Sequence, residues 1–213
     1  MSSAIEIAAR IDSCLPQTQC TRCGYPRCLT YAEAMARGEA DINQCPPGGD
    51  ITIQALARLL QVDTKPLNPA NGSHQGRVVA WVDEELCIGC RKCVDVCPVD
   101  AIIGANKLMH TVIAAQCTGC ELCLPPCPVD CIRLRAVNIP VDRASPWPDY
   151  TRAETEQWRR RAAARLQRLD QRRAARGAAK TRRRVASDQS ERERIRAEIR
   201  AAVERVRRRK SSA

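Results

Sequence analysis

The sequence CIGCRKCVDVCPVD at residues 87–100 recurs in kind as CTGCELCLPPCPVD at residues 117–130, with a period of 30 residues. Each copy has the spacing C-x2-C-x2-C-x3-C-P. In this spacing three thiolates surround one side of a [4Fe–4S] cluster, and the fourth reaches the cluster of the other copy. We therefore predict one cluster on Cys87, Cys90, Cys93 and Cys127, and a second on Cys117, Cys120, Cys123 and Cys97.

Glycine and proline occupy the same places in both copies. Gly89 and Gly119 allow tight turns between ligands without a Cβ clash, and Pro98 and Pro128 fix the bend after the fourth cysteine. The spacing is that of bacterial ferredoxins. Zinc sites use two CxxC pairs rather than two runs of four, so a zinc site or a disulfide framework is disfavoured here.

Composition limits the class of protein. The chain has 213 residues and 14 cysteines; we see no signal peptide and expect no secreted disulfide scaffold. It has no run of eighteen apolar residues, so we expect no transmembrane helix. Phe is absent and aromatic residues make up 3%. Bound clusters are therefore expected to replace part of the missing core, as metals do in other small domains.

Charge is distributed unevenly along the chain. The net charge of +11 combines −3 for residues 1–150, with 13 basic and 16 acidic residues, and +14 for residues 151–213, with 22 and 8. The sequence thus predicts an acidic redox body followed by a basic tail. Acidic residues near the clusters are expected to lower their potentials and to favour a basic partner.

A third cysteine set precedes the repeat. Cys20, Cys23, Cys28 and Cys45 follow C-x2-C-x4-C-x16-C, which is not ferredoxin spacing. Three close thiolates and a distant fourth can hold another cluster, and a structural zinc knuckle is the alternative. Cys14 and Cys131 fall outside all three sets and are expected to be small buried residues. His74 and His110 are read as ordinary polar residues, because nothing pairs them with a nucleophile or a carboxylate.

The segment around the third set carries a family resemblance. LPQTQCTRCGYPRC at residues 15–28, YAEA at residues 31–34 and CPPGG at residues 45–49 resemble the 4Fe-4S domain of RnfB, a component of the Rnf electron-transport complex. In that family this segment precedes two ferredoxin motifs, as it does here. The resemblance covers roughly residues 5–140, and it implies three [4Fe–4S] clusters, the first on Cys20, Cys23, Cys28 and Cys45.

The resemblance also implies partners. Members of that family relay electrons between a nicotinamide- or ferredoxin-linked input and membrane redox subunits. They usually begin with a hydrophobic anchor, which we expect this chain to lack. A flavoprotein or membrane electron-transport subunits are the expected partners, and the expected location is the cytoplasm or the inner face of the cell membrane.

The predicted fold is α+β. A helical 4Fe-4S domain at 1–62 contains helices at 5–15, 29–37 and 51–61, and a linker at 63–76 follows. A ferredoxin-like domain with internal two-fold symmetry occupies 77–140, with strands at 77–83, 101–103 and 131–134. The remainder, 141–213, is a basic tail that is helical or partly disordered.

Two capping boxes predict two helices in the tail. Thr151-x-x-Glu154 begins the first, which runs towards Gly177, and Ser190-x-x-Glu193 begins the second. Each carries a thin apolar stripe, which can close a hairpin or dock a partner; a solvated basic tail is the alternative. We expect the tail to be dispensable for cluster binding and to attract an anionic membrane surface or an acidic partner.

Taken together, the sequence predicts an electron-transfer protein without catalysis of its own. It relays single electrons between a donor and an acceptor that hold the catalytic cofactors. The chain has no G-x-G-x-x-G and no P-loop, so it shows no nucleotide site. The alternative is an iron–sulfur sensor or a nucleic-acid-binding protein that uses the basic tail, although the tail offers only Trp158 for stacking on bases.

Overall fold

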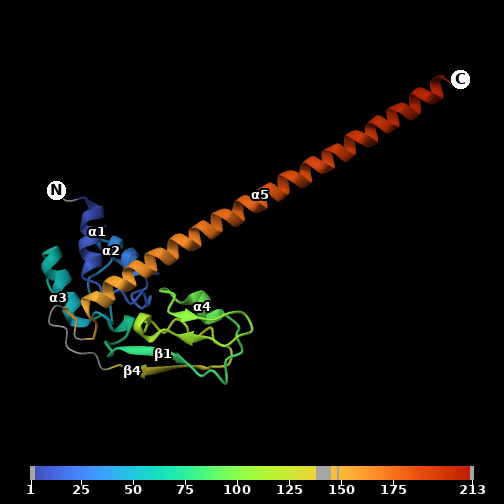
Figure 1. Ribbon diagram of the computed structural model, residues 1–213. Coiled ribbons are helices and arrows are strands. Elements are labelled where there is room, and N and C mark those ends of the chain that lie inside the picture. Colours follow the sequence, from blue (N-terminus) through green and yellow to red (C-terminus); the bar gives the residue numbers. More distant parts are fainter. Residues whose placement is uncertain (1–2, 138–144, 148, 212–213) are drawn as a thin grey trace. The chain divides into compact units, whose positions relative to one another are not determined.

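A computed structural model describes residues 3–137, 145–147 and 149–211 (Figure 1). It divides into two compact units, residues 1–165 and 166–213, which are considered separately below. The domain limit that we placed between residues 140 and 141 lies outside the described residues. In the part of the chain that is described, no helix is long and apolar enough to cross a membrane.

The first unit begins with three helices, α1 (Ala4–Ser13), α2 (Cys28–Ala36) and α3 (Gly49–Leu60). Their apolar faces meet in a small core that includes Ile11, Leu15, Tyr31 and Leu56. All three helices were predicted, but Ile5 does not lie on the buried face of α1: its side chain is 82% exposed. A capping box of Ser3 and Glu6 starts α1.

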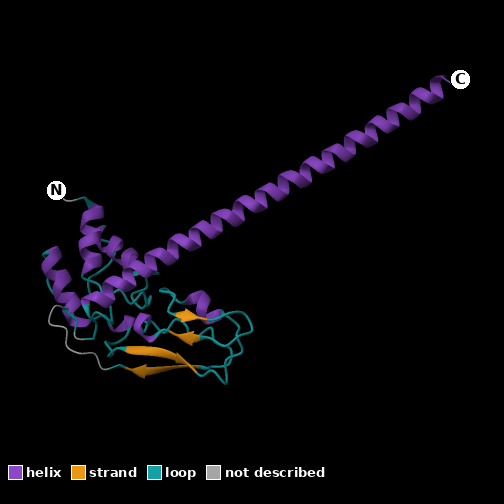
Figure 2. Ribbon diagram, in the orientation of Figure 1, coloured by secondary structure: helices purple, strands orange, loops and turns teal. Residues whose placement is uncertain are grey.

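The second half of this unit is the expected strand-rich body (Figure 2). β1 (Val78–Val82) pairs antiparallel with β4 (Ile132–Ala136), and β2 (Ile102–Ile103) pairs antiparallel with β3 (Thr111–Val112). Short helical turns complete it: η1 (Pro69–Asn71), α4 (Lys92–Val96) and η2 (Ala114–Gln116). The α+β prediction is therefore confirmed.

The register of the strands confirms the predicted two-fold symmetry. Val82 pairs with Ile132 in one ladder, and Ile102 pairs with Val112 in the other. Adding 30 to Val82 gives Val112, and adding 30 to Ile102 gives Ile132, so the two ladders are the same pairing seen in the two repeats. Each repeat therefore completes its ladder with a strand of the other, which brings the two cysteine runs together.

A single helix, α5 (Arg152–Ser211), replaces the two helices that the sequence predicted. The first capping box is present, because the Glu154 N–H donates to Thr151 Oγ1 and the Thr151 N–H donates to the Glu154 carboxylate. Gly177 and Ser190 instead lie inside the helix. A helical glycine costs only about 1 kcal/mol, and the flanking alanine and arginine residues favour helix strongly enough to offset it.

The first turns of α5 are part of the core of the first unit. Trp158 is fully buried, with the guanidinium of Arg77 5.0 Å from its ring centroid and the Tyr150 ring edge-on at 5.7 Å. Arg77 also pairs with Glu154, with 2.5 Å between Nη1 and Oε1. Sequence reasoning placed Trp158 on a thin stripe of a separate tail, and missed that it anchors the helix to the body.

Two arginines of this helix base reach different parts of the unit. Arg159 Nε donates to Asp12 Oδ2 at 2.8 Å, beside the end of α1. Arg161 Nε donates to the Val99 carbonyl at 2.7 Å, two residues after Cys97. The helix base thus links the three-helix part with the ferredoxin-like part.

Candidate iron–sulfur cluster sites

The two cysteine runs have the same backbone geometry. Positive φ angles occur at Gly89 and Gly119 (68° and 69°), and 30 residues apart again at Arg91 and Glu121 (64° and 63°). A Cβ on Gly89 would lie 2.5 Å from the Leu108 nitrogen, and one on Gly119 would lie 2.4 Å from the Val78 oxygen. Only glycine fits at both places, as predicted. Backbone that alternates between right- and left-handed conformations turns its N–H groups to one side and forms an anion-binding concavity.

Backbone N–H groups point at the cysteine sulfurs. The Ala80 N–H donates to Cys117 Sγ at 3.4 Å, and the His110 N–H donates to Cys87 Sγ at the same distance. The Ala101 N–H donates to Cys97 Sγ at 3.2 Å. Such donors favour the charged thiolate over the thiol, which is the form that binds metals.

The fourth cysteine of the second run, Cys127, shows the effect of such donors on acidity. Burial alone would raise the pKa of its thiol. The backbone N–H groups of Val129, Cys131 and Asp130 outweigh burial and lower the pKa below its ordinary value. The site therefore suits a bound anion with thiolate ligands.

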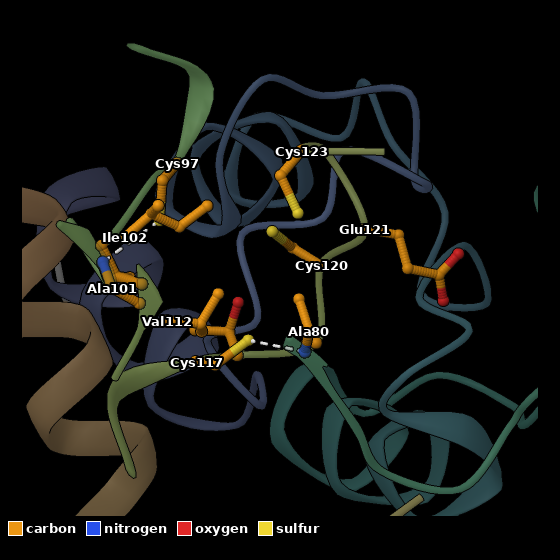
Figure 3. A pocket seen from close by; sticks show the side chains of 12 residues that line it. Ala80, Cys97, Ala101, Ile102, Val112, Cys117, Cys120, Glu121 and Cys123 are labelled. Carbon is orange, nitrogen blue, oxygen red and sulfur yellow. Dashed lines mark hydrogen bonds between the residues drawn. The ribbon is translucent and has the colours of Figure 1, made fainter. Parts of the chain in front are cut away.

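Cys97 of the first run lies with three cysteines of the second. Figure 3 shows the pocket that Cys97, Cys117, Cys120 and Cys123 line together, with the sulfurs of Cys120 and Cys123 facing into it. Burial raises the pKa of Cys120 and of Cys123 to about 12, and the neighbouring thiols, Cys97 among them, contribute to both shifts. These four residues could hold one cluster; we name them the Cys117 site.

The remaining four cysteines of the runs lie around Cys87, in what we name the Cys87 site. Burial raises the pKa of Cys93 to about 11, with further contributions from Cys90 and Cys87. Cys127, from the second run, has its Sγ 3.5 Å from that of Cys131, whose own pKa is affected by Cys87. Cys87, Cys90, Cys93 and Cys127 are thus brought towards one place from both runs.

The third set of cysteines is assembled by the loop before α2. Positive φ angles alternate along it at Gln17, Gln19, Thr21 and Gly24, so this loop too turns several N–H groups to one side. Cys28 and Cys45 are buried. Burial raises the pKa of Cys28 well above its ordinary value, and the nearby Cys45 and Cys20 thiols raise it further. Cys20, Cys23, Cys28 and Cys45 form what we name the Cys20 site.

These groups are wider than a site for one ion. Thiolates around a single tetrahedral zinc lie about 3.8 Å apart, given a Zn–S distance of about 2.3 Å. Among the described residues, no three His, Cys, Asp or Glu side chains close around a single metal ion. The observations that fit an iron–sulfur cluster are the nests of N–H groups, the N–H···S hydrogen bonds and the clustered thiols.

The Cys20 site lies against the Cys117 site. One pocket is lined by Cys20 and Arg22 from the first and by Thr118, Gly119 and Glu121 from the second. Arg22 and Glu121 form an ion pair across it at 2.7 Å. The Asn71 amide of η1 donates to the Arg22 carbonyl at 2.8 Å. The linker that sequence reasoning treated as a spacer thus helps to hold the two sites together.

Both histidines have partners, contrary to the sequence prediction. His74 Nε2 lies 3.0 Å from Asp149 Oδ2, and its Nδ1 lies 2.9 Å from the Pro46 carbonyl oxygen. His110 is buried, with Nδ1 3.6 Å from Cys87 Sγ and 3.7 Å from Cys93 Sγ. The available signal was the 30-residue repeat, which aligns His110 with Ala80.

The two cysteines outside the sets differ from one another. Cys131 is buried, as expected, but its thiol lies beside a cysteine of the Cys87 site. Cys14 is half-buried and donates to the Arg10 carbonyl at 3.5 Å. Burial raises the pKa of the Cys14 thiol, which keeps it in the neutral form.

Comparison with known proteins places these sites in a family. The profile described as "4Fe-4S dicluster domain" matches residues 80–134, and "Putative Fe-S cluster" matches residues 15–47. The RnfB protein of the "Ion-translocating oxidoreductase complex" of Pseudomonas aeruginosa is 54% identical over 158 residues, which are 74% of this chain and 81% of that protein. This chain belongs to the RnfB family. The resemblance read from the sequence is confirmed.

Other RnfB proteins match shorter stretches. The protein from Alkalilimnicola ehrlichii is 59% identical over 138 residues, 64% of this chain and 72% of that one. The protein from Thiobacillus denitrificans is 61% identical over 108 residues, 51% of this chain and 57% of that one. The chain thus spans little more than half the length of some of the curated relatives it matches. No solved structure matches the chain significantly.

Proposed function

We propose that this protein relays single electrons through three [4Fe–4S] clusters, as the iron–sulfur subunit of an Rnf-type oxidoreductase complex. The observation that carries the proposal is the arrangement of twelve cysteines in three adjacent groups, each beside backbone N–H donors or a nest of them. When bound, each cluster takes up and releases one electron. The chain itself holds the clusters, sets their surroundings and keeps them close together.

The ligand assignment follows from the grouping of the thiols. Cys20, Cys23, Cys28 and Cys45 hold the first cluster. Cys87, Cys90, Cys93 and Cys127 hold the second, and Cys117, Cys120, Cys123 and Cys97 hold the third. The exchange of Cys97 and Cys127 between the two runs is supported by the pocket that Cys97 shares with the Cys117 site and by the proximity of Cys127 to Cys131.

The contacts between the sites give the relay an order. The Cys20 and Cys117 sites share a pocket and the Arg22–Glu121 ion pair. The Cys117 and Cys87 sites exchange cysteines four residues before Ala101 and Cys131. The Cys117 site therefore lies between the other two, and an electron that enters at either end passes through it.

The partners of the relay follow from the family and not from a pocket. The curated relatives are named as subunits of ion-translocating oxidoreductase complexes, so the donor and the acceptor are other redox subunits, which hold the catalytic cofactors. The protein works in the cytoplasm or at the inner face of the membrane that carries such a complex.

The basic segment of α5 from residue 166 onward gives the relay a means of attachment. Residues 166–213 carry 17 basic and 6 acidic residues, a net charge of +11. Ile195, Ile199 and Val203 are about half exposed on it. A helix that combines basic residues with exposed aliphatic side chains is suited to an anionic lipid surface. We propose that this segment binds such a surface.

Cluster content tests the proposal directly. Protein purified without oxygen is expected to contain about twelve iron and twelve sulfide per chain, and all three clusters are expected to reduce and reoxidise reversibly in an electrochemical titration. Iron near eight together with bound zinc would show that the Cys20 site is a zinc knuckle. Clusters that only degrade on oxidation would favour a sensor over a relay.

A further inference from the structure

The Cys87 and Cys117 sites are related by the 30-residue repeat, yet they differ at two inner positions. Where the Cys117 site has Ala80, the Cys87 site has His110, and both residues donate their backbone N–H to the equivalent cysteine. Where the first repeat has Ala101, beside Cys97, the second has Cys131, beside Cys127. Two methyl groups thus face one site, and an imidazole and a thiol face the other.

The imidazole of His110 is held in place against two sulfurs. Its side chain is 1% exposed, with Nδ1 3.6 Å from Cys87 Sγ and 3.7 Å from Cys93 Sγ. Gly104 makes room for the ring, because a Cβ there would lie 2.0 Å from His110 Cδ2. The fit allows no other residue type at Gly104, whose φ is 153°.

The surroundings of the ring fix its tautomer. Nε2 is buried and has no hydrogen-bond partner among the described residues. A cysteine thiolate can only accept a hydrogen bond, so a proton on Nδ1 gives a donor facing the sulfurs and leaves Nε2 as the bare nitrogen. The reverse tautomer would leave an N–H buried without an acceptor, which costs about 1–3 kcal/mol.

We propose that His110, assisted by Cys131, gives the cluster at the Cys87 site a higher reduction potential than the cluster at the Cys117 site. The inference rests on the proposed function. Reduction adds negative charge at the sulfurs, and hydrogen-bond donors to those sulfurs stabilise it. Inside a dry site the donor is not screened by water. The Cys87 site has the imidazole N–H and an adjacent thiol in addition to the backbone donor, where the Cys117 site has methyl groups.

Exposed charges do not reverse this difference. Glu84 and Glu85 precede Cys87, where the second repeat has alanines, and they favour a lower potential at the Cys87 site; both are exposed and therefore screened. Arg91 at this site aligns with Glu121 at the other, which favours the proposed order, but Glu121 is paired with Arg22. The buried donor decides the difference, because its interaction with the sulfurs is the least screened.

The consequence is a preferred resting place for the electron. The Cys117 site lies between the other two, so a higher potential at the Cys87 site draws an electron past it to the far end of the relay. His110 is a positioning residue in this sense: it touches ligand sulfurs, and it changes where the electron rests without itself carrying it.

The test is an anaerobic redox titration of the full-length, cluster-loaded protein, followed by electron paramagnetic resonance. His110→Ala gives the Cys87 site the residue of its counterpart, and His110→Gln retains an N–H donor. We expect His110→Ala to lower the equilibrium constant for reduction of one cluster about tenfold, or about 59 mV for one electron, and His110→Gln to restore at least half of the shift. The same measurement on Cys90→Ser and Cys120→Ser identifies which signal belongs to which site.

Iron analysis keeps the outcomes separate. Twelve iron in wild type and in both variants, with unchanged potentials or with the shift in the Cys117-site signal, overturns the inference. Loss of the cluster in both variants also overturns it, since His110 would then serve assembly and not potential. Fewer than twelve iron in the wild-type protein counts against the proposed function and not against the role of His110.

Discussion

Replacing Trp158 by alanine is expected to loosen the base of α5 from the body of the first unit. The side chain is 0% exposed and contacts both Arg77 and Tyr150. Truncation of a fully buried tryptophan costs about 3–5 kcal/mol, which includes the lost contacts and the cavity that remains. With a urea dependence of about 2 kcal/mol per molar, the unfolding midpoint falls by about 2 M.

The assay follows far-ultraviolet circular dichroism and cluster absorbance in anaerobic urea titrations. Trp81→Ala is the control, because Trp81 is 38% exposed on β1 and should cost less than half as much. Trp158→Phe is the second control. The indole N–H of Trp158 has no hydrogen-bond partner among the described residues, so phenylalanine keeps most of the packing and should cost about 1 kcal/mol. A Trp158→Ala midpoint equal to that of Trp81→Ala would refute the packing argument.

Truncation separates the helix base from the rest of α5. A chain that ends at Arg165 keeps Trp158, Arg159 and Arg161, so it should retain its iron content and its stability. A chain that ends at Thr151 loses all three and should lose stability by at least as much as Trp158→Ala. The sequence alone placed the limit of the dispensable tail at residue 151, and the contacts of the helix base move it to residue 165. Equal stability of the two truncated chains would restore the earlier limit.

Three further predictions concern the cluster ligands, pH and the basic segment. Cys97→Ala should remove the cluster of the Cys117 site and Cys127→Ala that of the Cys87 site, and spectra showing the opposite losses would exclude the exchange of ligands; Cys14→Ala should change neither. Burial raises the pKa of Glu154, but hydrogen bonds from Thr151 and Arg77 outweigh it and lower the pKa below its ordinary value. The stability that Glu154 provides is therefore present above its unfolded pKa of about 4.3 and is lost as pH falls through the lower folded pKa, so the difference in urea midpoint between wild type and Glu154→Gln should shrink from pH 7 to pH 4; a constant difference would contradict this. Full-length protein should sediment with anionic but not neutral vesicles and release as salt rises, whereas the chain ending at Arg165 should not sediment; a shift on duplex DNA without vesicle binding would favour the nucleic-acid alternative.

The elements that were predicted well are those that local sequence determines. Spacing alone identified the three cysteine sets, since ligand geometry depends on a few neighbouring residues. The first strand and the three early helices followed from periodicity. The single long helix did not, because Gly177 and the Ser190 capping box are local stop and start signals that the continuous run of strong helix formers overrides.

The features that were missed depend on contacts between distant residues. Trp158 is buried by Arg77 and Tyr150, and nothing within a helical window around Trp158 indicates these partners. His110 lies 23 residues after Cys87 in sequence, and only the pairing of β2 with β3 brings it to that sulfur. The repeat offered one route to it: alignment of the two copies at a spacing of 30 residues places His110 opposite an alanine.

The helix base joins the two questions of stability and electron transfer. An electron passes between clusters only over short distances, so the sites of a relay must be held at fixed separations. Arg159 binds Asp12, which also accepts from the Gln17 amide at the start of the Cys20 loop, and Arg161 binds the carbonyl of Val99 beside Cys97. One turn of helix thus holds the loop of the first site and the exchanged ligand of the Cys117 site. Because these contacts are ion pairs and hydrogen bonds at the surface of a small core, the relay owes its spacing to residues that sequence spacing had assigned to a dispensable tail.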